Sequence, residues 1–320
     1  MPALVTSTVT LVALMATSAS PAAAQLPELA RVSAQYVAPT DLDGTMADVQ
    51  VTSYDVNLNV PIPLSESTFL IPGLAYHVDS VAFGGDTTGI NTPRSFHAVG
   101  VPVLFVQLLP QDWALSIRLA PSFAGDFTSL DGRMFLFSAV ALATHAFNER
   151  IVFGFGAVAN YSFGSFLPLP ALFVNWEPTD YFRVEGFLPA FVNATFHIGE
   201  RVELGMRGEV QGNSYGIRDE RIAGRWPCRA QGNDDPATVV DETESQESLC
   251  LDHIAYSVGS VGLTAAVRTF ETLWLGLYAG HTVFRRYERM NRHADSLDGG
   301  QSLPRSWLLR AELSWRLPTP

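Results

Sequence analysis

The sequence contains no lysine, so all 20 basic residues are arginine, and 32 acidic residues outnumber them for a net charge of −12. Charged residues make up only 16% of the chain, whereas about a quarter is usual in a soluble domain. With 47% hydrophobic residues, the chain is too apolar for an ordinary water-facing surface. The acidic balance excludes nucleic acid as an expected partner, because phosphate binding needs a basic surface.

The sequence also lacks an uninterrupted apolar run long enough for a membrane helix, which needs about 20 residues. Residues 151–176 contain no charge, but glycines and prolines such as Gly156 and Pro168 break them into short pieces. Residues 3–19 are apolar or small and lead into an Ala-x-Ala site at residues 22–24. This pattern predicts a secretory signal peptide over residues 1–24, cut after Ala24, and a mature domain over residues 25–320.

The apolar residues are spread over many short segments with a period of two. Such alternation places two sets of side chains on opposite faces of a strand. In the last segment, one set is Trp307, Leu309, Ala311, Leu313, Trp315 and Leu317, and the other is Ser306, Arg310, Glu312, Ser314 and Arg316, with Leu308 as the exception. Short and long polar links alternate between the segments, as in outer-membrane barrels with short periplasmic turns and long outer loops.

We therefore predict an all-β fold: a transmembrane, antiparallel, up-and-down β-barrel of about 14 strands in the outer membrane of a Gram-negative bacterium. In hydrocarbon every backbone N–H and C=O must be paired, so strands can span only as a closed barrel. A secreted β-sandwich also alternates but normally has a more charged exterior. Twelve strands would result if the pieces around Pro189 paired differently. The expected strands are 31–38, 47–61, 67–82, 95–108, 113–121, 133–147, 151–161, 168–176, 181–188, 191–198, 201–213, 253–270, 273–286 and 305–317.

Three adjoining segments, 166–172, 174–180 and 184–189, read FLPLPAL, VNWEPTD and VEGFLP. They resemble an uncharacterised family of Gram-negative outer-membrane β-barrels that is known only as a domain of unknown function. The resemblance implies a single barrel domain and carries no activity or functional residue. The chain departs from the usual pattern at its end, because outer-membrane barrels commonly finish on an aromatic residue and this chain finishes on Pro320.

The motif Arg-x-Glu recurs four times. Residues two apart on a strand share a face, so the charges of each pair are expected to point into the barrel lumen. One interpretation is a constriction that selects solutes by charge. The other, which we favour because the charges balance within each pair, is a structural network of ion pairs. The residues are Arg183 and Glu185, Arg201 and Glu203, Arg207 and Glu209, and Arg310 and Glu312.

The longest polar link, residues 214–252, contains the two cysteines, Cys228 and Cys250. An even number of cysteines in an exported chain predicts a disulfide bond between them. The acidic residues between them would either hold Ca²⁺ or Mg²⁺ against lipopolysaccharide phosphates or, as we favour, form a solvated outer loop. These residues are Asp234, Asp235, Asp241, Glu242, Glu244 and Glu247.

The sequence shows no catalytic motif, since its seven histidines are scattered and neither Gly-x-Ser-x-Gly nor His-Glu-x-x-His occurs. We therefore predict no enzyme, no cofactor and no metal site. The expected function is a channel or transporter for small solutes or apolar compounds, with outer-membrane lipid and lipopolysaccharide as surroundings. The alternative is a non-conducting structural or surface-interaction barrel that acts through its acidic outer loop. A basic cluster would contact lipid A phosphates or offset that loop: Arg285, Arg286, Arg289 and Arg292.

Overall fold

The computed structural model describes residues 28–39, 49–83, 94–162, 165–218, 251–291, 296–297 and 301–316. Almost all of these residues lie in β-strands, as the alternating sequence predicts. Within these ranges, no helix is long and apolar enough to span a membrane. The strands are β1 (Ala30–Val37), β2 (Val49–Asn59), β3 (Ile62–Pro63), β4 (Thr68–Phe83), β5 (Arg94–Gly100), β6 (Val103–Leu109), β7 (Trp113–Gly125), β8 (Phe135–Asn148), β9 (Ile151–Ser162), β10 (Ser165–Thr179), β11 (Phe182–Leu188), β12 (Phe191–Ile198), β13 (Val202–Gly216), β14 (His253–Arg268), β15 (Leu273–Met290), β16 (Gln301–Leu303) and β17 (Trp307–Trp315).

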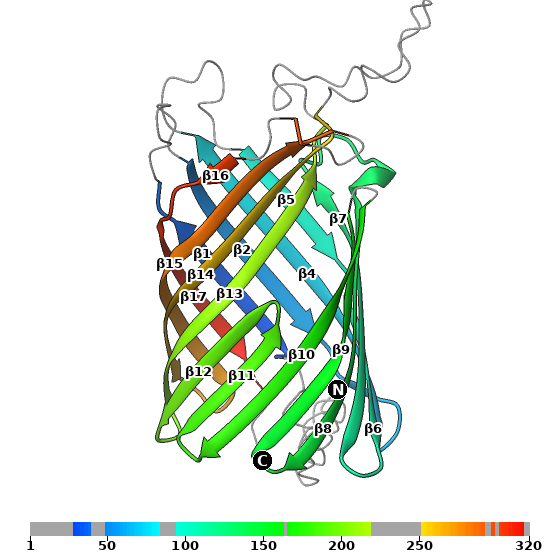
Figure 1. The fold of residues 1–320 in the computed structure, drawn as a ribbon, viewed down its shortest axis with the longest axis vertical. Helices are drawn as coiled ribbons and strands as arrows, with labels where there is room; N and C mark the ends of the chain where they lie inside the picture. The colour runs from blue at the N-terminus through cyan, green and yellow to red at the C-terminus, as the bar shows by residue number, and fades with distance from the viewer. Residues whose placement is uncertain are drawn as a thin grey trace, which may run out of the picture.

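The strands form one closed antiparallel sheet (Figure 1). Closure occurs at β1, which pairs with β2 on one side and with β17 on the other. We call the end with long links, such as residues 217–252 between β13 and β14, the loop end; it lies at the top in Figure 1. The opposite end, where hairpins such as β8–β9 turn within two residues, is the turn end.

The 17 strand segments make 14 complete strands of the barrel wall, which we call staves. β3 continues β2 along β4, and β5 and β6 keep one register along β4 and β7. β16 is a short addition to β15 near the loop end. β11 and β12 pair separately on either side of Pro189, which excludes the 12-strand alternative. The predicted antiparallel barrel of 14 strands is confirmed.

The outer face of the barrel is apolar. Large side chains such as Phe155, Leu263 and Leu277 project from alternate strand positions and are 53%, 63% and 58% exposed. Trp307 and Trp315, at the two ends of β17, also lie on this face. Because the sheet closes on itself and its outer face is apolar, the barrel meets both requirements for spanning a membrane.

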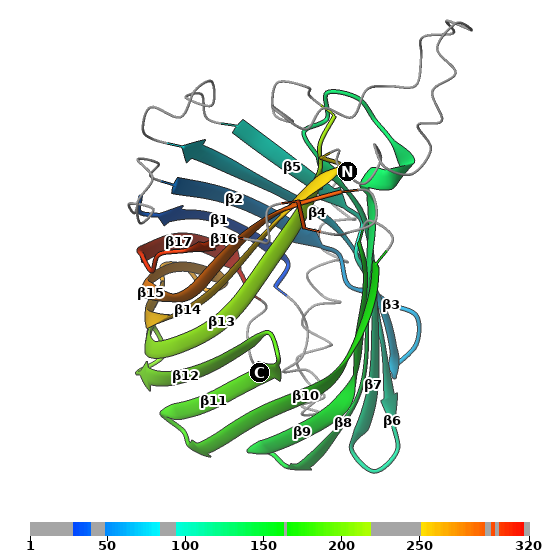
Figure 2. The same cartoon turned by 45° about the horizontal axis from the view of Figure 1, so that its top comes forward.

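A hydrophobic core lies inside the loop-end half of the barrel, between β13 to β17 on one side and β1 to β7 on the other. Strands from opposite sides of the barrel meet there, since Gly216 on β13 pairs with Gly125 on β7 and Figure 2 shows β13 rising to the upper end of β7. A Cβ atom on Gly125 would lie 2.7 Å from the Gly216 carbonyl oxygen, so this approach requires glycine. The core consists of Val37, Val51, Val81, Phe96, Ala124, Tyr215, Ile217, Leu251, Ile254, Tyr256, Val258, Tyr278, Leu303 and Leu308. Leu308, the exception to the alternation of its strand, is a fully buried member.

Candidate functional site: the barrel lumen

Strand register and burial assign each side chain to the outer face or to the lumen. On β17, for example, Leu309 and Leu313 are exposed on the outer face, so Arg310 and Glu312 between them point inward. Extending this assignment from strand to strand through the pairing registers divides the lumen lining into two parts of different chemistry.

The first part, which we call the polar wall, is formed by β13 to β15, β17, β1, β2 and the loop-end half of β4. Its lumen-facing side chains carry most of the charge inside the barrel. They include Ser33, Gln35, Ser53, Asp55, His77, Asp79, Glu203, Arg207, Glu209, Gln211, Asn213, Ser260, Arg310, Glu312 and Arg316.

The second part, which we call the apolar wall, is formed by β6 to β10 and the turn-end half of β4. Its lumen-facing side chains are mostly aliphatic or aromatic: Ile71, Leu104, Val106, Val140, Leu142, Val158, Leu169, Ala171 and Phe173. The polar exceptions include Ser116, Arg118, Ser122, Ser138, Thr144, Asn160 and Asn175, with Glu177 at the turn end of β10.

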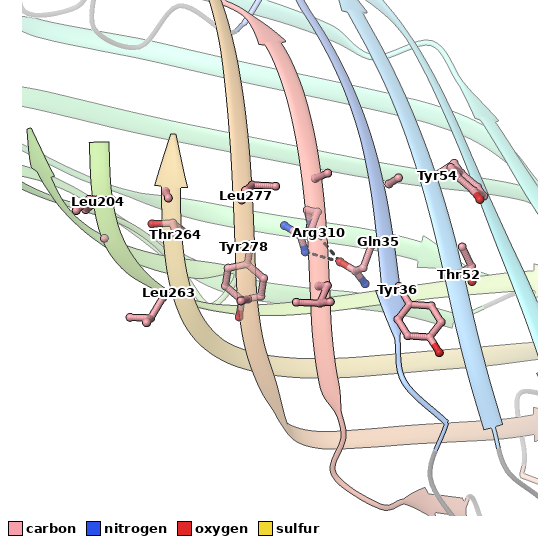
Figure 3. Close-up of a pocket in the computed structure, with 16 residues that line it drawn as sticks. Gln35, Tyr36, Thr52, Tyr54, Leu204, Leu263, Thr264, Leu277, Tyr278 and Arg310 are labelled. Carbon is pink, nitrogen blue, oxygen red and sulfur yellow. Dashed lines mark hydrogen bonds between the residues drawn. The ribbon is translucent and has the colours of Figure 1, made fainter. Parts of the chain in front are cut away.

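Two arginines share one carboxylate on the polar wall. Arg207 Nε donates to Glu209 Oε2 at 2.8 Å, and Arg310 Nη1 donates to the same oxygen at 3.2 Å. Arg310 Nη2 donates to Glu209 Oε1. Figure 3 shows the second partner of this side chain, Gln35, whose Oε1 accepts from Arg310 Nε at 2.9 Å. Because the Glu209 side chain is only 4% exposed, these charge-assisted hydrogen bonds are shielded from water. The cluster links strand β13 to strands β17 and β1 from inside the barrel.

A histidine lies between two aspartates on β2 and β4. His77 Nδ1 is 2.6 Å from Asp55 Oδ1, and His77 Nε2 is 3.0 Å from Asp79 Oδ1. His77 Nε2 also lies 2.9 Å from Asn213 Nδ2. We call His77, Asp55 and Asp79 the histidine cluster.

The histidine cluster is also bonded to the opposite side of the lumen. Tyr215 Oη donates to Asp79 Oδ2 at 2.7 Å, and Asn213 Nδ2 donates to the same oxygen at 3.4 Å. Both residues belong to β13, which is not a neighbour of β4 in the sheet. These bonds therefore join two sides of the barrel beside the hydrophobic core.

The structure brings together three of the eight residues in the Arg-x-Glu pairs: Arg207, Glu209 and Arg310. The others lie apart from this cluster. Glu203 accepts from Arg316 Nη1 at 3.1 Å, and Arg183 lies 3.9 Å from Glu177. Glu185 faces Asn175 and Asn193 on the neighbouring strands, and Glu312 faces Ser33. Arg201, which the sequence placed at the start of a strand, lies in the turn before β13 and is exposed.

Sequence reasoning did not identify Gln35, Asn213 or Tyr215 as partners of these charges. Their inward positions could have been found from the sequence. Gln35 lies directly opposite Arg310, and Asn213 and Tyr215 lie an even number of residues from Glu209 on the same strand. Which inward residues meet across the lumen depends on the approach of β13 to β7 at the loop end, and periodicity alone does not carry that information.

A second group of charges lies at the loop end. Arg218 Nη2 is 2.9 Å from Asp131 Oδ2, and both Arg218 Nη1 and Arg133 Nη1 lie within 3.4 Å of Asp252 Oδ1. Burial by itself would raise the pKa of Asp252, but the hydrogen bond with His253 and the charges of the two arginines outweigh it and hold that pKa below its usual range. The pKa of Asp131 is also lowered, since its backbone hydrogen bond and Arg218 outweigh burial.

The predicted outer-loop features fall outside the described residues. These include Cys228, Cys250 and the acidic residues between them, so the disulfide bond stays a prediction, as does the signal peptide over residues 1–24. Of the basic cluster, Arg285 is buried and Arg286 forms an ion pair with Glu288, so Arg285 adds nothing to an exposed basic surface. Within the described part of the chain, no group of three or more His, Cys, Asp or Glu side chains could hold a metal ion.

A hollow of about 800 Å³ lies against staves β13 to β15, β17, β1 and β2 (Figure 3). Most of its lining residues face outward by the strand alternation. Small side chains such as Ala34, Ala265 and Ala311 form its floor, and Tyr36, Tyr54 and Leu263 stand around it. The hollow therefore belongs to the membrane-facing surface and not to the lumen.

The barrel can now be compared with known proteins. Residues 84–230 match a family described as "Domain of unknown function (DUF6268)". This stretch includes the three segments at 166–189 on which the resemblance to such a family rested, and it confirms that resemblance. No curated protein matches the chain.

Several solved structures are similar in fold. An outer membrane channel from Pseudomonas putida F1 is 12% identical, with 91% of this chain and 97% of that chain covered and a TM-score of 0.45. The Pseudomonas putida toluene transporter TodX is 9% identical, with 93% and 92% covered and a TM-score of 0.41. The NanC porin is 9% identical, with 90% and 100% covered and a TM-score of 0.35. At these values the likeness carries no conclusion about function.

Proposed function

We propose that the protein is an outer-membrane channel for small apolar or amphipathic molecules. The observation that carries this proposal is the apolar wall. A water-filled pore for ions or sugars has a polar interior, whereas one wall of this lumen is lined mostly by aliphatic and aromatic side chains. Such a lining gives water little to bind and gives an apolar solute a favourable surface to contact.

Aromatic side chains extend the apolar wall onto β11 and β12. Phe173 on β10 lies beside Phe187 on β11, which lies beside Phe191 on β12, next to the β11–β12 hairpin and away from the turn end. The next strand begins the polar wall, where Phe191 lies beside Glu209 and its ring is 5.0 Å from the Arg207 guanidinium carbon. A molecule with an apolar body and a polar group would contact both walls at this boundary.

In this proposal, the hydrophobic core and the hydrogen bonds between β13 and β4 hold the channel shut at the loop end. Passage would require the hydrophobic core and the bonds from Tyr215 and Asn213 to Asp79 to separate from one wall. These contacts are local, so a displacement of β13 and β14 relative to β4 and β7 would open the path and leave the 14-strand closure intact.

The second candidate is a non-conducting barrel that presents its acidic outer loop to partners at the cell surface. The contacts across the loop end also favour this candidate, because a barrel that does not conduct can keep them permanently. The two candidates differ in one measurable property, the uptake of solutes.

The test is uptake of an apolar fluorescent probe, N-phenyl-1-naphthylamine, by Gram-negative cells that express the full chain. We expect faster uptake than in cells with an empty vector, and no gain for a sugar of similar size. Phe173→Glu places a charge on the apolar wall and should abolish the gain, whereas Leu172→Ala, on the outer face of the same strand, should preserve it. A folded barrel with heat-modifiable migration and no gain in uptake would exclude the channel and support the second candidate.

A further inference from the structure

Arg118 is the one arginine on the apolar wall among the described residues. It lies on β7 with the same parity as the buried Ala114 and Ala124, while Phe123 and Leu119 of opposite parity are exposed on the outer face. The side chain therefore points into the lumen. Arg118 is exposed, so a solute in the lumen can reach it.

The surroundings of Arg118 are apolar on both sides. The pairing registers place Leu104 on β6 and Val140 on β8 directly beside it. Beyond them, Ile71 lies next to Leu104, and Val158 lies next to Val140. Leu169 on β10 then completes a row across six staves, with Arg118 as its single charge.

The Arg118 guanidinium makes no hydrogen bond or ion pair within the part of the chain that the structure describes. The arginines of the polar wall differ in this respect. Arg207 and Arg310 both bind Glu209, and Arg316 binds Glu203. Five guanidinium donors in a planar fork, beside aliphatic side chains and without an acidic partner, form the complement of a carboxylate attached to an apolar body.

We infer that Arg118 is a binding site for amphipathic monoanions: molecules that carry one carboxylate on an apolar body. The carboxylate would accept two parallel hydrogen bonds from the guanidinium, and the apolar body would lie along Leu104, Val140 and Val158. This inference rests on the proposed channel function and names the class of solute that the apolar wall would hold.

The chemistry of Arg118 and its neighbours also predicts which solutes such a site would select. A neutral molecule of the same shape gains the apolar contacts but leaves the guanidinium without a bidentate partner. A dianion or a sugar leaves polar groups unpaired against the aliphatic row. The site therefore favours one charge and one apolar body over either feature alone.

The test uses the full chain in lipid nanodiscs and two matched probes, 2-naphthoate and the neutral 2-naphthamide, titrated by calorimetry against empty nanodiscs. We expect the wild type to bind 2-naphthoate at least tenfold more tightly than 2-naphthamide. Arg118→Gln should reduce 2-naphthoate affinity by about tenfold and leave 2-naphthamide binding unchanged. Arg118→Lys should fall between the two, because an ammonium group keeps the charge but loses the bidentate geometry.

The matched control is Arg31→Gln, which removes a lumen-facing arginine from the polar wall and should leave both affinities unchanged. Equal binding of the two probes by the wild type, or equal 2-naphthoate binding by Arg118→Gln, would overturn the inference. In either case, continued uptake of N-phenyl-1-naphthylamine by cells would show that the channel function stands and that only the anion site is wrong. Loss of both probe binding and uptake would reject the channel function itself.

Discussion

Tyr215 donates a 2.7 Å hydrogen bond to Asp79 across the lumen, from β13 to a strand that is not its neighbour in the sheet. Tyr215 is 1% exposed and its ring stacks on Phe96, with ring centroids 5.4 Å apart. The same side chain thus belongs to the hydrophobic core and to the polar cluster beneath it. This makes Tyr215 the residue through which the closure of the lumen can be tested.

Tyr215→Phe should weaken the closure without removing the core. The variant keeps the ring and loses one buried hydrogen bond, a change of about 1–2 kcal/mol in the free energy of unfolding. Because the lost bond joins the two sides of the lumen, we expect faster uptake of N-phenyl-1-naphthylamine together with a lower urea midpoint. Tyr54→Phe is the control, since Tyr54 is on the outer face and 50% exposed; it should alter neither measurement. A lower midpoint with unchanged uptake would show that this bond stabilises the barrel and does not gate it.

Glu209→Gln should destabilise the barrel strongly. The substitution leaves the guanidinium groups of Arg207 and Arg310 without their shared carboxylate, and breaking a buried ion pair by removing one partner costs about 3 kcal/mol or more. The measurement is a urea titration in detergent micelles, followed by tryptophan fluorescence. The double variant Glu209→Gln with Arg310→Gln should lose about 1–3 kcal/mol less than the sum of the single variants, because the two residues interact directly. Additive losses would show that the two charges are independent.

The sequence predicts the fold well because the alternation of outward and inward side chains along a barrel strand is a local pattern. The alternation on β17 is enough to separate Arg310 from Leu309, and every predicted strand overlaps an observed one. The lumen is less predictable. Arg207, Glu209 and Arg310 could be placed inside, but their meeting with Gln35 depends on the pairing of β1 with β17 through barrel closure. The bond from Tyr215 to Asp79 depends on the approach of β13 to β7 at the loop end, which is a contact between strands that are distant in the sequence.

The loop-end charge group predicts a pH dependence. Asp252 and Asp131 have lowered pKa values in the folded state, below the ordinary value of 3.8. A lowered pKa contributes stability that is fully present above the unfolded pKa and is lost as the pH falls through the folded pKa. The loop end should therefore be stable above about pH 5 and loosen progressively below about pH 4.

Hydrogen exchange of the amides of residues 216–218 and 251–254, measured between pH 5 and pH 3, would follow this loosening once the intrinsic pH dependence of exchange is subtracted. In Asp252→Asn, protection should be lower at pH 5 and change less between pH 5 and pH 3 than in the wild type. Glu149→Gln, at the turn end, should reproduce the wild-type dependence. Protection in the wild type that stays constant over this range would contradict the assignment of the stabilising charges to Asp252 and Asp131.

Gly125→Ala should separate β13 from β7. The added Cβ atom would lie 2.7 Å from the Gly216 carbonyl oxygen and 2.8 Å from the Met134 methyl carbon, so the backbone contact between the two strands must open. Because this contact holds the loop-end closure, we expect faster uptake of N-phenyl-1-naphthylamine and faster amide exchange at residues 216–218. Gly132→Ala is the matched control, since nothing lies within 4 Å of a Cβ atom there, and it should behave as the wild type. If Gly125→Ala folds and keeps wild-type uptake, the approach of β13 to β7 is not part of the barrier to passage.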